Sequence, residues 1–252
     1  MLWNDIVNQV GSYAQQEPAV ANPSFTLSLP TFTSSAELRI YRDLDFLSAR
    51  GQNATVSFTT GSRTLSLAGM TGALIGGFPV QNAYPVVVQG IAAILPAATL
   101  PAAGKRVRFL LTTVDFIDSI WPSEATTQAP ADGQAYYAML DHQTAIVAPT
   151  PDAAYKAEVT GTWRPAPMSP AQPESWLGDN LPDLLLKATL VEAFSWEENY
   201  QQTMAGGGAS AYWEGEYQKA KQTAIEEEQR RRGQDPGWAP FSPTPLAGNP
   251  RT

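Results

Sequence analysis

The segment from Leu181 to Tyr200 constrains the fold of this chain more than any other part of it. It predicts a helix with apolar residues on nearly every side: Leu184, Leu185, Leu186, Leu190, Val191, Ala193, Phe194 and Trp196. A helix that is apolar all round must be covered by other elements. Asn180 is the expected N-cap, and Pro182 fits the first turn, where a missing N–H does no harm. We therefore predict that other helices pack around residues 181–200.

Three further helices are predicted from apolar residues at helical spacing. The first spans residues 2–15, with its buried positions at Leu2, Ile6, Val10 and Tyr13. After a loop containing Pro18 and Pro23, the second runs from Ser35 to Ser48, with Ser34 or Ser35 as cap and Gly51 just past its end. Its stripe is expected at Leu38, Tyr41, Leu44 and Phe46 or Leu47. The last helix, from Ser210 to Arg232, carries Trp213, Tyr217, Ala220 and Ala224 on one side.

Between residues 54 and 163 the apolar residues alternate with polar ones, as in half-buried strands. We predict a hairpin of 55–58 with 64–67, strands at 85–88 and 106–110, a second hairpin of 136–140 with 144–148, and a last strand at 155–163. Residues 116–121 predict a short helix stopped by Pro122.

The predicted fold class is α+β. The N-terminal helices and a C-terminal helical hairpin form a helical bundle, an antiparallel β-sheet or sandwich domain is inserted into it, and an extended C-terminal tail follows. The expected parts are residues 1–50, 51–165, 166–232 and 233–252.

The predicted tail has prolines at positions 236, 240, 243, 245 and 250. This proline density favours an extended chain. Pro-rich termini are often disordered, but solvated tails seldom carry large apolar side chains at this density. We therefore expect a partner to be bound through Trp238, Phe241, Pro243 and Leu246.

The composition of the chain argues against several classes of function. The net charge of −8 and pI near 4.7 argue against an ordinary DNA-binding surface. The chain has no cysteine and one histidine, so we expect no metal site and no cofactor. The N-terminus lacks the pattern of a secretory signal. Residues 84–100, the most apolar window, are interrupted by prolines and polar residues and are not expected to span a membrane.

Catalytic groups are scarce. His142 lies between Asp141 and Gln143 in a predicted turn, and is interpreted as a surface residue. Glycosidic bonds can be hydrolysed by a pair of carboxylates, for which Asp115 and Asp118 or Glu192 are candidates. Glu192 lies on the apolar helix, so it must be paired or lie at an interface.

The run Glu226-Glu227-Glu228-Gln229-Arg230-Arg231-Arg232 places each acid four residues before an arginine. Each such pair stabilises a helix by about 0.2–0.5 kcal/mol. The run is interpreted either as a stable solvated helix end or, together with Glu192, as a set of inter-subunit charge contacts.

Several segments in a shared order resemble the head-to-tail adaptor (connector, or head-completion) proteins of short-tailed bacteriophages. The resemblance spans residues 31–232. It includes A-E-L-R-I-Y-R-D-L at 36–44, A-P-T-P-D-A-A-Y at 148–155, W-R-P at 163–165 and P-D-L-L-L-K-A-T-L-V-E-A at 182–193.

The resemblance implies a structural virion protein and not an enzyme. It implies a ring, dodecameric in this family, that binds beneath the portal protein and joins it to a tail nozzle or tube protein and to fibres. Viral DNA would pass through the lumen without specific binding. The protein would be made in the host cytoplasm and located at the head-tail junction. Two alternatives remain: a virion-associated peptidoglycan hydrolase, and a fibre or carbohydrate-binding β module with Tyr136 and Tyr137 exposed.

Overall fold

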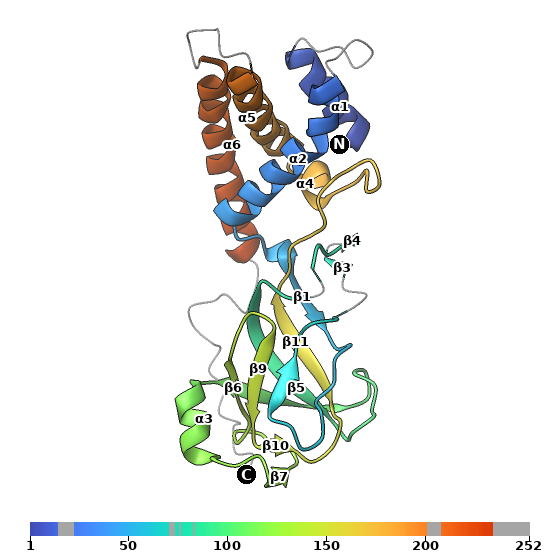
Figure 1. The fold of residues 1–252 in the computed structure, drawn as a ribbon, viewed down its shortest axis with the longest axis vertical. Coiled ribbons are helices and arrows are strands. Elements are labelled where there is room, and N and C mark those ends of the chain that lie inside the picture. The colour runs from blue at the N-terminus through green and yellow to red at the C-terminus, as the bar shows by residue number, and fades with distance from the viewer. Residues whose placement is uncertain (15–22, 71–73, 76, 83, 201–207, 234–252) are drawn as a thin grey trace, which may run out of the picture. The chain divides into compact units, whose positions relative to one another are not determined.

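The computed structural model describes residues 1–14, 23–70, 74–75, 77–82, 84–200 and 208–233 (Figure 1). The fold is mixed α+β, with six α-helices and an antiparallel-rich sheet among these residues. The chain divides into two compact units. Residues 1–47 and 167–252 form what we call the helical unit, and residues 48–166 form the β unit.

Helix α5 (Pro182–Tyr200) is the centre of the helical unit. It contacts α1 (Trp3–Tyr13), α2 (Pro23–Asp43), α4 (Trp176–Asn180) and α6 (Gly208–Gly233). The prediction that this apolar helix is covered by others is confirmed. Its buried residues include Leu184, Leu185, Ala188, Leu190, Val191 and Ala193.

Helix α2 begins at Pro23, so the prediction of a start at Ser35 was wrong. Ser34 and Ser35 lie inside the helix. The Ser/Thr-rich N-terminal half reads as a loop, but its hydroxyls bond back to the preceding turn, as Thr33 does to the Leu29 carbonyl at 3.0 Å. Burial of apolar side chains decides in favour of helix, along the stripe Phe25, Leu29, Phe32, Ala36 and Ile40.

The helix ends also differ in detail from the sequence prediction. In α1 the buried positions are Trp3, Ile6 and Val10, whereas Leu2 and Tyr13 are exposed. Asn180 does not cap α5, because it belongs to α4 and its amide donates to the Trp176 carbonyl at 3.0 Å. Gly51 lies in a strand and does not terminate a helix.

The β unit contains a seven-stranded sheet in the order β1-β11-β5-β6-β8-β9-β2. Its strands are β1 (Arg50–Asn53), β2 (Thr64–Ser66), β5 (Val87–Leu95), β6 (Lys105–Leu111), β8 (Tyr136–Met139), β9 (Thr144–Ala148) and β11 (Lys156–Thr162). Within this seven-stranded sheet only the β6–β8 pair is parallel, and α3 (Val114–Ile120) lies in the connection between these two strands. Two small pairs complete the unit: β3 (Leu74–Ile75) with β4 (Phe78–Pro79), and β7 (Thr127–Gln128) with β10 (Thr150–Pro151).

Most predicted strands are confirmed, as are the hairpin of 136–140 with 144–148 and the helix before Pro122. The first predicted hairpin was wrong. Strand β2 pairs with β9, while residues 55–58 lie against the start of β11 through a single bridge between Ser57 and Lys156. Gly61, with φ of +73°, turns the chain between two different partners instead of closing a hairpin.

One face of the sheet curls around the apolar core of the β unit. Trp163 and Tyr137 are fully buried there, and the Phe58 and Phe109 rings stack with centroids 5.3 Å apart. The opposite face of β8 and β9 is covered by α3 through Ile117. No described helix is long and apolar enough to cross a membrane.

The chain enters and leaves the β unit on neighbouring strands. Arg50 of β1 is paired with Thr162 of β11, and the Trp163 N–H donates to the Ala49 carbonyl at 2.8 Å. The two ends of this long insertion are therefore adjacent.

Candidate interaction surfaces

The charged run at the end of α6 forms two of the predicted pairs. Glu227 and Arg231 lie 2.5 Å apart, and Glu226 and Arg230 lie 3.9 Å apart. The second of these pairs is exposed, with side-chain accessibilities of 55% for Glu226 and 75% for Arg230. Such pairs add little to stability on their own, so both side chains are available to a partner.

Glu228 and Arg232 bind within the chain. Glu228 is buried, and its Oε1 accepts a hydrogen bond of 2.5 Å from the Leu47 N–H. Arg232 lies 2.7 Å from the Asp45 carboxylate and also donates to its backbone carbonyl. The end of α6 thus holds residues 45–47, which directly precede the β unit.

Glu192 lies at a hollow of about 290 Å³ between α2 and α5. The hollow is lined by Ser35, Leu38, Arg39, Arg42, Asp43 and Glu192. Glu192 is half-buried, and no ion pair joins it to the residues that the structure describes. Glu192 therefore shares the hollow with Arg39 and Arg42 without an ion pair to either of these described residues.

Other charges of the hollow are fixed by α6. Arg39 lies 2.6 Å from Glu214, and this hydrogen bond raises the pKa of the arginine. Asp43 accepts from the Tyr217 hydroxyl at 2.8 Å and from Lys221 at 3.1 Å. Burial works against ionisation of Asp43, but these two donors lower its pKa below the usual range. The hollow is thus a preorganised charged surface.

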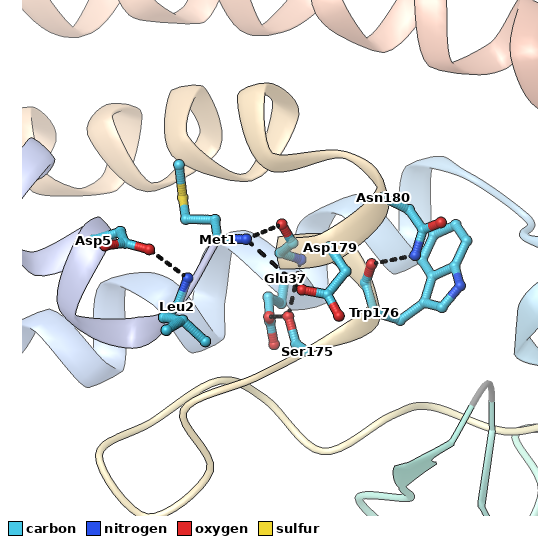
Figure 2. A network of polar contacts seen from close by, with 9 residues as sticks. Met1, Leu2, Asp5, Glu37, Ser175, Trp176, Asp179 and Asn180 are labelled. Atoms are coloured by element: carbon cyan, nitrogen blue, oxygen red, sulfur yellow. Dashed lines mark hydrogen bonds and ion pairs between the residues drawn. The ribbon is translucent and has the colours of Figure 1, made fainter.

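Glu37, which was not predicted as a site residue, is the most buried of the described acidic residues outside the β unit. Its two oxygens accept hydrogen bonds from the Ser175 hydroxyl at 2.8 Å and from the Met168 N–H at 3.0 Å. Figure 2 shows this contact beside the α4 segment, where the amino group of Met1 binds the Gly178 carbonyl. Burial raises the pKa of Glu37 to about 7, although both hydrogen bonds oppose the shift. In the sequence Glu37 lies in the first turn of the helix predicted from Ser35, where an acid is ordinary, so no pattern marked it as buried.

Asp115 and Asp118, which were proposed for hydrolysis, both lie on α3. Asp118 lies 2.6 Å from Arg63, whereas Asp115 is exposed on the first turn of α3. His142 is exposed, with its ring 5.5 Å from that of Tyr84, and Asp141 accepts from the Gln143 N–H. The described residues contain no group of three or more His, Asp or Glu side chains that could hold a metal ion.

An aromatic surface lies on the outer side of the β unit. The Tyr136 ring is 5.4 Å from that of Phe116 and 5.6 Å from that of Trp121. Tyr137, which was expected to be exposed beside Tyr136, is buried in the core. The hypothetical saccharide site therefore loses one of its two aromatic residues, because neighbouring side chains of a strand point to opposite faces.

The predicted tail contacts Trp238, Phe241, Pro243 and Leu246 lie outside the described residues. Among those described, the surfaces available to partners are the hollow at Glu192, the Glu226–Arg230 pair and the aromatic surface of the β unit. These surfaces are suited to contacts between proteins. Such surfaces are typical of a protein that works as part of an assembly.

Comparison with protein families identifies the family of assembly proteins to which the chain belongs. The family model of the SU10 adaptor protein matches residues 1–243, so the chain belongs to this family of phage adaptors. A search of curated proteins gave no match. Membership implies a structural, non-enzymatic role in the virion and contacts with portal and tail components.

Proposed function

We propose that this chain forms a dodecameric ring under the portal, links the capsid to the tail and lines the DNA exit channel. The observation that carries the proposal is the family match over residues 1–243. Two features of the chain support the proposal. The first is the helical unit packed around α5, which would form the wall of the ring in each subunit. The second is the set of charged side chains on that unit that can contact a neighbouring subunit.

One set of subunit contacts in this proposal is electrostatic. Glu192 faces its hollow without a described ion pair, and Glu226 and Arg230 are exposed at the end of α6. A neighbouring subunit would use these side chains, with Glu227 and Arg231 nearby, to set the register of the ring. Glu228 and Arg232 have a second role, holding residues 45–47 of their own chain.

We assign a different role in the assembly to each part of the subunit. The helical unit, as a bundle, forms the ring wall, and the β unit contacts the tail nozzle or tube and the fibres. The residues from 233 to 252 reach the portal or a neighbouring subunit through Trp238, Phe241, Pro243 and Leu246. The net charge of −8 suits a lumen that repels the DNA backbone, so that the genome can slide without binding.

Mixing the purified chain with its cognate portal ring and weighing the product by mass photometry tests the proposal. A discrete complex with one copy per portal subunit is expected. An unchanged portal mass at saturating concentrations of the chain would overturn portal docking.

A further inference from the structure

An apolar surface on the β unit has no described cover. We call it the α3 face and define it by Leu110, Phe116, Ile120, Trp121 and Tyr136. Phe116 is 38% exposed, Leu110 49% and Ile120 50%. Large side chains exposed together in this way mark interaction sites more often than single exposed residues do.

The five residues form one continuous patch. Phe116 and Ile120 are one turn apart on α3, so they lie on the same side of the helix. The rings of Phe116 and Trp121 both lie within 5.6 Å of the Tyr136 ring. Leu110 is the register partner of Tyr136 on the neighbouring parallel strand and therefore points to the same face. All residues between 110 and 136 are described, and none of their helices or strands covers the patch.

The chemistry of this patch matches a proline-rich segment. Clustered aromatic rings receive extended proline-rich peptides, whose preformed conformation loses little entropy on binding. The same chain contains such a segment beyond the described residues. It reads Pro240-Phe241-Ser242-Pro243, a P-x-x-P spacing, with Trp238 just before it.

We propose that residues 234–252 of a neighbouring copy bind the α3 face in the assembled ring. This rests on the ring of the proposed function. In such a ring every copy offers one segment and one face, so a head-to-tail contact fills all of them when the ring closes. An extended proline-rich segment rises about 3.1 Å per residue, which gives residues 234–252 a reach of roughly 60 Å. That length exceeds the roughly 39 Å of a helix as long as α6, so the segment can extend well beyond its own helix.

A labelled peptide of residues 234–252 tests the chemistry, with fluorescence anisotropy as readout and the chain ending at Gly233 as receptor. Saturable one-to-one binding is expected. Phe116→Ser in the receptor should weaken it about tenfold or more, as loss of an aromatic anchor does, whereas Leu100→Ser, at a distant exposed leucine, should not. The peptide carrying Pro240→Ala and Pro243→Ala leaves the receptor untouched and should also bind about tenfold more weakly. Absent binding, or equal binding by both peptides, would overturn the proposal.

Cross-linking in the ring tests which copy supplies the segment. The full chain carries a photoreactive residue in place of Phe241, and light and isotope-heavy chains are mixed on the portal ring. Cross-links from the segment to residues 114–121 that join light with heavy chains are expected. Two results would overturn this inference and leave the proposed function standing. One is that cross-links join only chains of the same isotope. The other is that a ring of complete mass gives no cross-links. A missing ring would count against the proposed function, while the peptide experiment would still report on the α3 face.

Discussion

The Glu37 carboxylate accepts a hydrogen bond of 2.8 Å from the Ser175 hydroxyl, joining residues 138 positions apart in the chain. Ser175 is also the N-cap of α4, since its oxygen accepts from the Gly178 N–H. One buried acid thus holds both the segment at Met168 and the start of α4 against α2. The nearby Tyr41 hydroxyl is buried without a hydrogen-bond partner among the described residues. No described cation pairs with the acid, so its charged form depends on two neutral donors.

Stability should therefore fall as pH rises. Burial raises the pKa of Glu37 from 4.5 to about 7, so the folded state holds the proton more tightly than the unfolded state. The resulting stabilisation is complete below about pH 4.5 and is lost as pH rises through 7. It amounts to roughly 3 kcal/mol at most.

Glu37→Gln should flatten this dependence, because its amide does not titrate. Urea unfolding at pH 5, 7 and 8 measures it, with Glu174→Gln at an exposed position as the matched control. Equal pH profiles for Glu37→Gln and the parent chain would contradict the assignment.

Glu228→Ala should lower the free energy of unfolding by about 1–3 kcal/mol, the range for leaving a partly buried donor unpaired. The donor is the Leu47 N–H, which Glu228 binds at 2.5 Å. Glu226→Ala, two residues earlier on the same helix, removes only an exposed contact of 3.9 Å and should change stability by less than about 0.5 kcal/mol. Chemical denaturation of both variants checks the contrast, and similar losses would show that the contact at Leu47 has no special weight.

Glu192→Lys should reduce assembly on the portal while leaving the fold intact. The side chain is half-buried at its hollow, beside Arg39 and Arg42, so a lysine there adds like charge to a surface that we assign to a neighbour. Mass photometry of the portal mixture and circular dichroism of the free chain give the two readouts. Glu124→Lys carries the same charge change on an exposed position of the β unit. Normal ring mass for Glu192→Lys would remove Glu192 from the interface.

A chain ending at Gly233 should attach to the portal more weakly and melt at the same temperature. The described helices and strands all lie before residue 234, so the truncation removes none of them. Attachment is measured by titrating the portal ring with each chain, and stability by thermal unfolding. Unchanged attachment would mean that the described units alone bind the portal.

The sequence predicted those elements whose pattern is set by local burial. Helix α5 was evident because nearly every position is apolar, and the hairpin of β8 with β9 because its strands flank a short polar turn. The start of α2 was missed, since Ser and Thr residues mask a stripe that only tertiary burial reveals. The pairing of the strands could not be predicted either. Strand β2 pairs with a strand about eighty residues away, and nothing in residues 64–66 indicates that partner.

Among the candidate contacts, too, those set by local spacing were predicted, whereas those set by the folded chain were not. The pairs Glu226–Arg230 and Glu227–Arg231 follow from helical spacing and were predicted. The partners of Glu228 and Arg232 come from residues 45–47, which are close only in the folded chain. Glu37 was not singled out, because in the sequence it reads as a first-turn helix acid.

The pairing of Arg50 with Thr162 has a consequence for how this gene can change. Since both ends of the β unit emerge side by side, a short peptide could close the gap that its removal leaves. Recombination could thus exchange residues 48–166 as one piece, giving the chain a different β unit without redesign of the helices that carry it.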